Sequence, residues 1–309
     1  MITALTKKVR NFGNLWQEVG MQQSLKILRA KIRLARIRSR AGNETLHRHH
    51  IEALGLPMYL DLTDQGLSKT LFYRGVHEPI ATQWVKEELT PGMTVIDIGA
   101  NIGYYVLLAA SKIGPQGKIY AIEPVASTIA ILRKNLELNH LDNVVTECVA
   151  LSSHAGEATM QVTEKRNWAS LAHENLKSDR AVSAQQGTYE TITVPTKTLD
   201  RFVEEHEIGS VNFLRMDVEG YETEIIQGAS QTLAAHRPLK LFMEVHPFFA
   251  RDMQPFVQMI NTLYDAGLGV KYIGYHRDVV MSWPDRETVI NYLSQETFGE
   301  APHLLFASQ

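Results

Sequence analysis

VIDIGANIGY, residues 95 to 104, is the segment of this 309-residue chain from which its architecture follows. Val95, Ile96 and Ile98 form a short apolar run, which is typical of a strand buried on both faces. Gly99 and Gly103 then permit sharp turns of the backbone against a ligand before a helix begins. The segment therefore predicts a strand, a ligand-binding turn and a helix.

A second apolar run, residues 118 to 122, ends in Glu123-Pro124, and Glu123 follows Gly103 by twenty positions. A carboxylate at the tip of a strand beside a glycine-rich turn can accept both hydroxyls of a ribose. The turn lacks the third glycine of the dinucleotide fingerprint, and an aspartate, Asp97, precedes it. These features favour an adenosine cofactor without a pyrophosphate, such as S-adenosylmethionine, over a tight turn that binds nothing.

Strands and helices alternate after this segment, which predicts a parallel sheet covered by helices on both faces. The predicted strands are 94–98, 118–122, 144–151, 159–163, 190–195, 211–216, 239–245, 270–273 and 304–307. The predicted helices are 102–113, 126–139, 199–206, 221–234 and 249–266. Residues 152–195 interrupt the rhythm with a polar stretch at 164–187, and so long an irregular insertion is often a substrate lid.

The sequence predicts three parts. Residues 1–50 form a basic helical arm, and residues 51–90 form a subdomain that packs on the core. That subdomain contains a hairpin over Tyr59–Arg74, broken at Asp64-Gln65-Gly66, and a helix over Glu78–Leu89. Residues 91–309 form the cofactor-binding domain, with the insertion 152–195 inside it.

The arm is strongly basic, because ten of the chain's 31 Lys and Arg residues lie in residues 1–40, against one of its 34 acids. A helix is expected over Gln22–Arg40, with Leu25, Leu28 and Ile32 on one apolar stripe and Ile27, Leu34 and Ile37 on another. One interpretation is docking through residues 22–40 on an anionic membrane, a lipid-linked glycan or a partner chain. The other is a solvated arm that packs on the acidic remainder of the chain.

Cellular location follows from two features of the composition. Cys148 is the only cysteine, so an intramolecular disulfide is excluded, a reducing compartment is indicated, and Cys148 itself is expected to be a buried packing residue. The sequence has no run of eighteen apolar residues. A cytoplasmic protein is expected; under the docking interpretation, its basic arm would contact the inner face of a membrane.

A second segment, NFLRMDVEGYE at residues 212–222, has the same pattern as the first, an apolar strand with an acid near its carboxyl end and a glycine before a helix. An apolar strand delivers Asp217 and Glu219 to its carboxyl end, and Gly220 opens the next helix. Glu222 and Glu224 are expected to be solvated or capping residues in the first turn of that helix. Because the carboxyl ends of neighbouring strands face one crevice, four acids are expected to gather there. They are Asp97, Glu123, Asp217 and Glu244.

Six segments resemble, in the same order, the FkbM family of S-adenosylmethionine-dependent methyltransferases. They are DIGANIG at 97–103, Glu123-Pro124, NLELN at 135–139, TLD at 198–200, MDVEGYE at 216–222 and Gly228-Ala229. The resemblance implies a class I methyltransferase fold, which is a Rossmann-like α/β fold. Its sheet has seven strands, mostly parallel with the last strand antiparallel. The resemblance also implies O-methylation of a hydroxyl on a sugar, glycan or natural product.

The resemblance and the strand pattern together nominate residues for each role. Cofactor-binding candidates are Asp97, Gly99, Ala100, Asn101, Gly103, Tyr104, Glu123, Pro124 and Ala150. Catalytic candidates are Asp217, Glu219, Glu244 and His246, and substrate-binding candidates in the insertion are Asn167, Trp168 and Ser170. Arg215 stands where the family usually has a lysine, so the role of that lysine is not carried over.

A hydroxyl acceptor has to lose its proton during methyl transfer. We expect Asp217 to act as the general base, or to hold a divalent metal that lowers the pKa of the hydroxyl, with Glu244 as the second ligand of any such metal. One alternative is a catalytically silent protein that binds the cofactor or a partner and is anchored by its arm. A weaker alternative, suggested by the basic arm, is an RNA methyltransferase. DNA is not an expected partner, because the chain after residue 40 is acidic and the Asn-Pro-Pro-Tyr type motif of base methylation is absent.

Overall fold

The computed structural model describes residues 21–40, 44–163, 169–171, 189–247, 252–275, 279–295 and 301–308. The chain forms two compact units, residues 1–77 and 78–309. This division differs from the predicted three parts. The predicted boundary after residue 50 falls inside strand β1 (Leu46–Ile51), and residues 78–90 belong to the larger unit.

The smaller unit contains helix α2 (Met21–Arg40), the antiparallel strands β1 and β2 (Leu56–Asp61), and helix α3 (Leu67–Arg74). The predicted hairpin over Tyr59–Arg74 is wrong. The hairpin turns earlier, between Ile51 and Leu56, and Asp64 precedes helix α3 instead of forming a turn between strands. Its carboxylate accepts the backbone N–H groups of Gly66 and Ser68, each at 2.7 Å, which satisfies donors at the start of α3.

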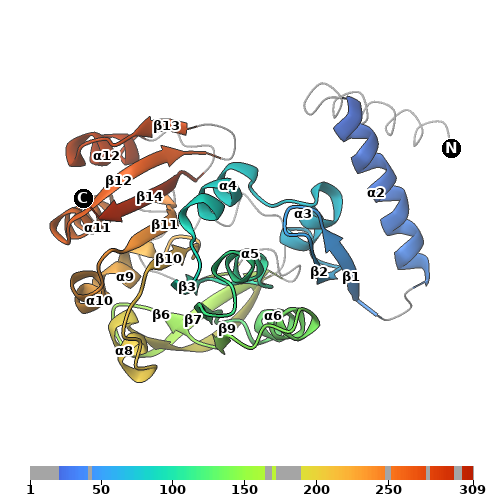
Figure 1. The fold of residues 1–309 in the computed structure, drawn as a ribbon, viewed down its shortest axis with the longest axis horizontal. Helices are drawn as coiled ribbons and strands as arrows, with labels where there is room; N and C mark the ends of the chain where they lie inside the picture. The colour runs from blue at the N-terminus through green and yellow to red at the C-terminus, as the bar shows by residue number, and fades with distance from the viewer. Residues whose placement is uncertain are drawn as a thin grey trace. The chain divides into compact units, whose positions relative to one another are not determined.

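The larger unit is built on an eight-stranded sheet in the order β13-β12-β14-β11-β10-β3-β4-β5 (Figure 1). The strands from β5 to β11 are parallel to one another. The bounds are β3 Thr94–Ile98, β4 Lys118–Ile122, β5 Val144–Glu147, β10 Phe213–Met216, β11 Lys240–Glu244, β12 Leu268–Gly274, β13 Val279–Ser282 and β14 His303–Ser308.

The order of the parallel strands locates the ligand crevice. The chain runs outward in one direction from β3 to β4 and β5, and in the other direction from β10 to β11. Right-handed crossovers in opposite directions place their helices on opposite faces of the sheet. The boundary between β3 and β10 is therefore the topological switch point, where open α/β sheets bind ligands at the carboxyl ends of their strands.

The last strand, β14, is antiparallel to both β11 and β12, as predicted. The predicted count of seven strands is exceeded by one, because β13 adds an antiparallel edge strand to β12. Neither β13 nor the following helix α12 (Arg286–Leu293) was predicted, and α12 has few buried positions that could form an apolar pattern.

The remaining helices follow the predictions closely, with two exceptions: α11 (Gln254–Asp265) begins later than the predicted helix over 249–266, and the predicted helix over 221–234 is divided. They are α4 Pro79–Glu88, α5 Tyr104–Ile113, α6 Ala126–Leu138, α8 Leu199–Glu205, α9 Glu222–Gln227, α10 Ser230–Ala235 and α11 Gln254–Asp265. The predicted helix over 221–234 is two helices, which meet at Gly228-Ala229. A Cβ on Gly228 would lie 2.3 Å from the backbone oxygen of Ser152. Glycine therefore permits the segment that joins the two helices to approach the backbone at Ser152 closely.

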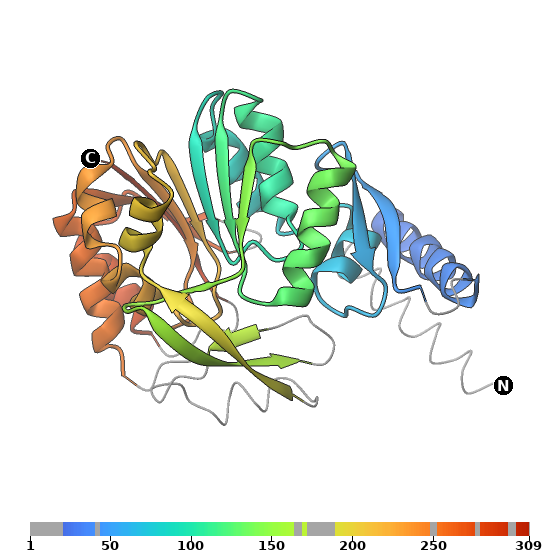
Figure 2. The same cartoon turned by 90° about the horizontal axis from the view of Figure 1, so that it is seen from below.

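The insertion forms a second sheet in the order β6-β9-β7-β8, which Figure 2 shows as a separate body beneath the main sheet in that view. Its strands are β6 Ala150–Leu151, β7 Gly156–Thr163, β8 Ala169–Leu171 and β9 Tyr189–Lys197. The predicted strand 144–151 is therefore divided between the two sheets, with the break at Cys148-Val149. Cys148 itself is only half-buried.

In the part of the chain that the structure describes, no helix combines the length and the apolar character needed to cross a bilayer.

Candidate active site

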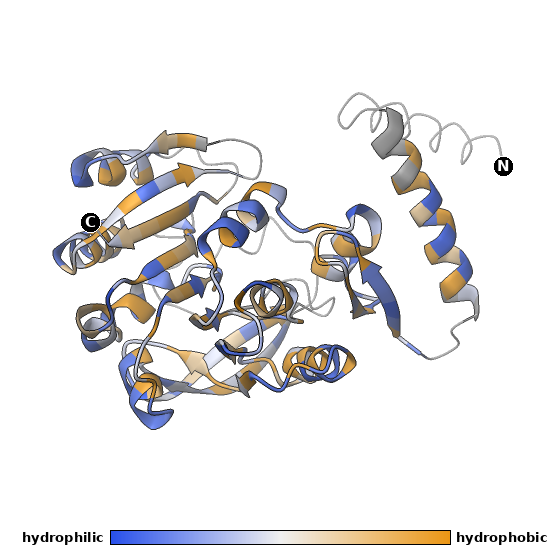
Figure 3. Cartoon of the chain, in the orientation of Figure 1, coloured by the Kyte–Doolittle hydropathy of each residue, from blue (hydrophilic) through white to orange (hydrophobic). Residues whose placement is uncertain are grey.

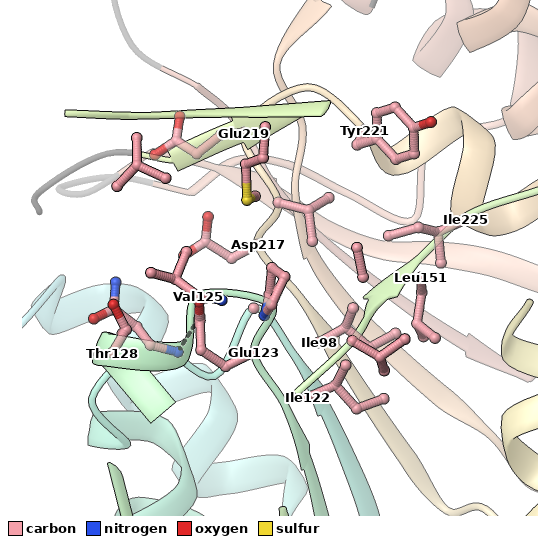
Figure 4. A pocket seen from close by; sticks show the side chains of 18 residues that line it. Ile98, Ile122, Glu123, Val125, Thr128, Leu151, Asp217, Glu219, Tyr221 and Ile225 are labelled. Carbon is pink, nitrogen blue, oxygen red and sulfur yellow. Dashed lines mark hydrogen bonds between the residues drawn. The ribbon is translucent and has the colours of Figure 1, made fainter. Parts of the chain in front are cut away.

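A pocket lies at the switch point, where the carboxyl ends of β3, β4 and β10 meet the second sheet. The empty space in and around it is about 810 Å³, part of which is open solvent. Figure 4 shows Glu219, Asp217 and Glu123 following one another along one side, with apolar side chains across from them. Those labelled apolar residues are Ile98, Ile122, Leu151 and Ile225.

Glu123 is buried at the end of β4, with 6% of its surface exposed. Its Oε2 accepts the backbone N–H of Asn101 at 3.0 Å, and its Oε1 accepts that of Val125 at 2.9 Å. Burial raises the pKa of Glu123 to about 7, against the lowering effect of these two hydrogen bonds. Each carboxylate oxygen keeps a second acceptor position, so the geometry is suited to a pair of ribose hydroxyls.

The turn after β3 is shaped by backbone contact with the strand end beside it. Gly99 has φ +82°, and a Cβ there would lie 2.0 Å from the backbone oxygen of Asp217. Asn101, which also lines the pocket, has φ +49°, a region that asparagine tolerates better than most residues. The turn thus brings the β3 end and the β10 end together at the floor of the pocket.

Five of the nine predicted cofactor-binding residues line the pocket: Gly99, Asn101, Glu123, Pro124 and Ala150. The other four do not. Gly103 packs the start of α5 on α6, since a Cβ there would meet Leu132 at 2.4 Å. Ala100 is buried and donates its N–H to the Ile122 backbone oxygen. The buried Tyr104 hydroxyl contacts the Thr82 hydroxyl at 3.1 Å.

Asp97, the fourth, is held beneath the pocket by Arg215. Parallel register places these two residues directly opposite each other on β3 and β10. The guanidinium donates to Asp97 Oδ1 at 3.1 Å and to Asp217 Oδ2 at 2.6 Å, and it lies 4.2 Å from the centre of the Tyr105 ring. Burial still raises the pKa of Asp97, although the neighbouring guanidinium lowers it. Arg215 therefore links a buried acid to an acid on the pocket wall.

His246 connects the pocket to a buried carboxylate. Its Nδ1 lies 2.7 Å from Glu222 Oε1, and its Nε2 lies 3.4 Å from Glu219 Oε2. Burial alone would lower the pKa of His246, but Glu222 and Glu219 raise it well above its ordinary value. Glu222 is fully buried, so of the two expectations for it the solvated one is wrong; its Oε1 accepts the backbone N–H of Gly220 at 3.0 Å, just before α9, in line with the capping one. The tertiary position of His246 explains why an acid at that helix start is buried.

Glu219 and Asp217 belong to the same group as His246. Each of the three offers one atom, and these atoms lie within 4.8 Å of one another. Glu219 has φ +53° and precedes Gly220 at φ +99°, a sharp turn that directs its carboxylate to the pocket wall. Two carboxylates and one imidazole are a donor set suited to a divalent cation.

Glu244 falls in a neighbouring group with Glu78 and His303. Its Oε1 lies 3.8 Å from His246 Nε2, and its Oε2 lies 3.8 Å from His303 Nε2. Burial raises the pKa of Glu244 well above its ordinary value, and the nearby Asp217 and Glu78 add to that effect. The structure thus places Asp217 and Glu244 in two adjoining groups, and their pairing as ligands of one metal stays a prediction.

The insertion contributes to the pocket through residues that the sequence did not nominate. Met160 and Val162 of β7 are buried and line it, together with Val149, which precedes β6, and Leu151 of β6. The apolar alternation of β7 was a usable signal. Of the predicted substrate-binding residues, Asn167 and Trp168 lie outside the described residues, and Ser170 pairs with Gln161 in the second sheet.

Residues 97–272 match the model of the methyltransferase FkbM domain, more than half of the chain. Methyltransferase 1 of Beauveria bassiana is 29% identical over 147 residues, which cover 43% of this chain and 57% of that relative. The 31-O-demethyl-FK506 methyltransferase FkbM of Streptomyces tacrolimicus is 27% identical over 160 residues, with coverage of 46% and 61%. The 2-O-methyltransferase NoeI of Sinorhizobium fredii is 23% identical over 176 residues, with coverage of 54% and 71%. The chain spans less than two thirds of the first two relatives.

Proposed function

Because the chain belongs to the FkbM family of S-adenosylmethionine-dependent methyltransferases, we propose that it transfers a methyl group to a hydroxyl of a sugar, glycan or natural product. The names of two relatives specify O-methylation, which supports oxygen as the acceptor atom. The observation that carries the proposal is that Glu123 and Asp217 line one pocket. The pocket therefore combines a site suited to adenosine with a neighbouring acid that can act on an acceptor.

The residues of the pocket fit the cofactor. Glu123 would accept the ribose hydroxyls, and Val149, Leu151 and Met160 would contact the adenine ring with their apolar surfaces. When bound, S-adenosylmethionine supplies an electrophilic methyl carbon on a sulfonium sulfur, and transfer to a hydroxyl leaves a thioether and releases one proton. The chain's remaining tasks are to align the acceptor oxygen and to take up that proton.

Asp217 is the proposed base. It lines the pocket with 21% of its side chain exposed, and Arg215 holds its Oδ2 at 2.6 Å, which orients the carboxylate. Glu219 lies beside it on the pocket wall and would orient the acceptor hydroxyl or carry the proton onward. The buried pair of His246 and Glu222 fixes the position of Glu219, which is how His246 would support the reaction without touching the acceptor.

A divalent cation is the alternative means of activating the hydroxyl. Asp217, Glu219 and His246 would be its ligands, with Glu222 orienting the imidazole through Nδ1 so that Nε2 faces the two acids. A bound cation would lower the pKa of a coordinated hydroxyl, and it would displace the proton from His246. Turnover that survives exhaustive chelation would leave the base alone as the mechanism.

The first experiment is calorimetric titration of S-adenosylmethionine and S-adenosylhomocysteine into the full chain and into Glu123→Ala. Micromolar binding that the substitution weakens strongly would support the cofactor site. Glu157, an exposed acid on β7, provides the matched control, and Glu157→Gln should bind as the wild type does. Absence of binding to the wild type would overturn the proposal.

The second experiment measures methyl transfer to a panel of hydroxylated glycans and natural products. Asp217→Asn should retain cofactor affinity and lose at least about a hundredfold in kcat, as expected for a missing general base. Full activity in Asp217→Asn would remove this residue from the mechanism. Cofactor binding without turnover on any acceptor would favour the silent scaffold instead.

A further inference from the structure

Helix α2 in the smaller unit combines high positive charge with two apolar stripes. Met21–Arg40 contains seven Lys and Arg residues and no acid. Figure 3 shows hydrophobic and hydrophilic residues alternating along its length. From the sequence alone, two stripes argue against a simple membrane-surface helix, because such a helix has one apolar face.

The structure assigns one of these stripes to packing within the unit. Ile27 and Leu34 are 5% and 6% exposed, and α2 packs on α3. On the same helix, the Arg33 guanidinium lies 5.9 Å from the centre of the Phe72 ring of α3. The stripe of Ile27 and Leu34 is therefore the inner face of α2 and is accounted for by the fold.

The other stripe stays in contact with solvent. Leu25, Leu28 and Ile32 are 40%, 40% and 47% exposed, and they are three of the five large hydrophobic side chains that are exposed among the described residues. At about 100° per residue, the three lie within an arc of roughly 60° on the outer side of the helix. Three exposed side chains of this size on one face of a helix form an apolar patch of the kind that binds a partner.

Exposed basic residues border this patch on both sides. By the same helical geometry, Arg29 and Arg36 lie along one edge of the patch and Lys31 lies beyond the other edge, and all three are exposed. Long basic side chains can extend their charged ends toward phosphates while an apolar stripe enters the acyl region below them. The outer face of α2 therefore has the arrangement of an interfacial helix.

We propose that the outer face of α2 docks the protein on the surface of an anionic phospholipid bilayer. Charge complementarity selects this occupant over a second copy of the chain, because two such helices would bring like charges together without an acid to offset them. It also selects lipid over nucleic acid, since three aliphatic side chains at the centre of the face gain little from a phosphate backbone and gain much from a bilayer. Each basic residue near an anionic surface contributes about 1 kcal/mol of attraction.

The test is co-sedimentation of the full chain with vesicles of phosphatidylcholine alone and of phosphatidylcholine with phosphatidylglycerol. Wild type should bind the anionic vesicles, and binding should weaken as salt is raised. Leu28→Glu with Ile32→Glu should lower the partition coefficient at least about tenfold, because two apolar side chains become charged at the contact. Val280→Glu, at an exposed apolar position on β13, is the matched control and should bind as wild type does.

Equal binding to neutral and anionic vesicles, or an unchanged partition coefficient in the double variant, would overturn the proposal. So would a wild-type dimer in solution that the double variant dissociates, which would assign the face to a second copy. Circular dichroism and cofactor titration on each variant separate a loss of docking from a loss of folding. Because none of the substituted residues lines the pocket, cofactor affinity should be the same in all of the variants.

Discussion

The protonation state of Glu123 should control nucleoside binding near neutral pH. Burial raises the pKa of this carboxyl from its ordinary 4.5 to about 7 in the ligand-free protein. Ribose hydroxyls donate hydrogen bonds, and a carboxylate accepts them more strongly than a neutral carboxyl does. Binding should therefore weaken as the pH falls through about 7.

The magnitude follows from the fraction of Glu123 that is ionised. With a pKa of about 7, roughly nine tenths of the groups are ionised at pH 8 and roughly one tenth at pH 6. If only the ionised form binds, the apparent Kd is inversely proportional to the ionised fraction. It therefore rises about tenfold when the pH is lowered from 8 to 6. Because a neutral carboxyl still accepts one hydrogen bond, tenfold is the upper bound.

The assay is calorimetric titration of 5′-methylthioadenosine across this pH range. This fragment of the cofactor carries adenine and ribose but lacks the amino and carboxyl groups, so the ligand itself does not titrate there. Glu123→Gln should bind weakly and without the pH dependence, whereas the matched control Glu157→Gln should keep it. A wild-type Kd that is constant from about pH 6 to about pH 8 would refute the reasoning, and so would a pH dependence that persists in Glu123→Gln.

The raised pKa of Glu123 also makes the free energy of unfolding depend on pH. The folded-state pKa of Glu123 lies above the unfolded value, so the proton favours the folded state. The contribution of protonated Glu123 to the free energy of unfolding is fully present below about pH 4.5. It is lost as the pH rises through about 7, and the loss is up to about 3 kcal/mol. Urea unfolding of wild type and Glu123→Gln should show the difference, and a difference between the two that does not change with pH would contradict the assignment.

Four substitutions test the packing of the larger unit. Gly99→Ala should cost at least about 2 kcal/mol of unfolding free energy and abolish nucleoside binding, because its Cβ would lie 2.0 Å from the Asp217 backbone oxygen; a variant that unfolds and binds as wild type does would refute this. Arg215→Met should cost about 3–5 kcal/mol, since it leaves the buried Asp97 without its cation. Adding Asp97→Leu should restore part of that loss in urea unfolding, and no restoration would exclude the buried charge as its cause. Thr198→Ala removes the side-chain oxygen that caps α8 and should cost about 1 kcal/mol, with a lowered Tm and unchanged nucleoside affinity; altered affinity would show that the cap also shapes the pocket.

Local patterns in the sequence were enough to predict the elements that carry the pocket. The bounds of β3 and β4 agree with the predicted strands 94–98 and 118–122. Apolar runs of four or five residues that end in glycine or an acid are strong local signals. Glu123 could be predicted as a pocket residue because its position depends only on the strand that delivers it and on the neighbouring glycine turn.

Contacts between distant segments could not be predicted in this way. Arg215 joins Asp97 because the register of β10 against β3 places them opposite each other, although they are 118 positions apart. Glu222 is buried because the end of β11 brings His246 against it. Neither pairing leaves a mark in the local spacing of the residues involved.

The sequence by itself determined the strand, turn and helix of the cofactor segment, the acids at the strand ends and the basic character of α2. These depend on short-range steric preference, hydrophobic periodicity and charge. Only the tertiary structure decided that Asp217 joins Glu219 and His246 while Glu244 joins Glu78 and His303, and which apolar stripe of α2 is left exposed. Strand register and helix packing set these outcomes, because they depend on the surfaces of several segments at once, whereas a sequence pattern describes one segment at a time.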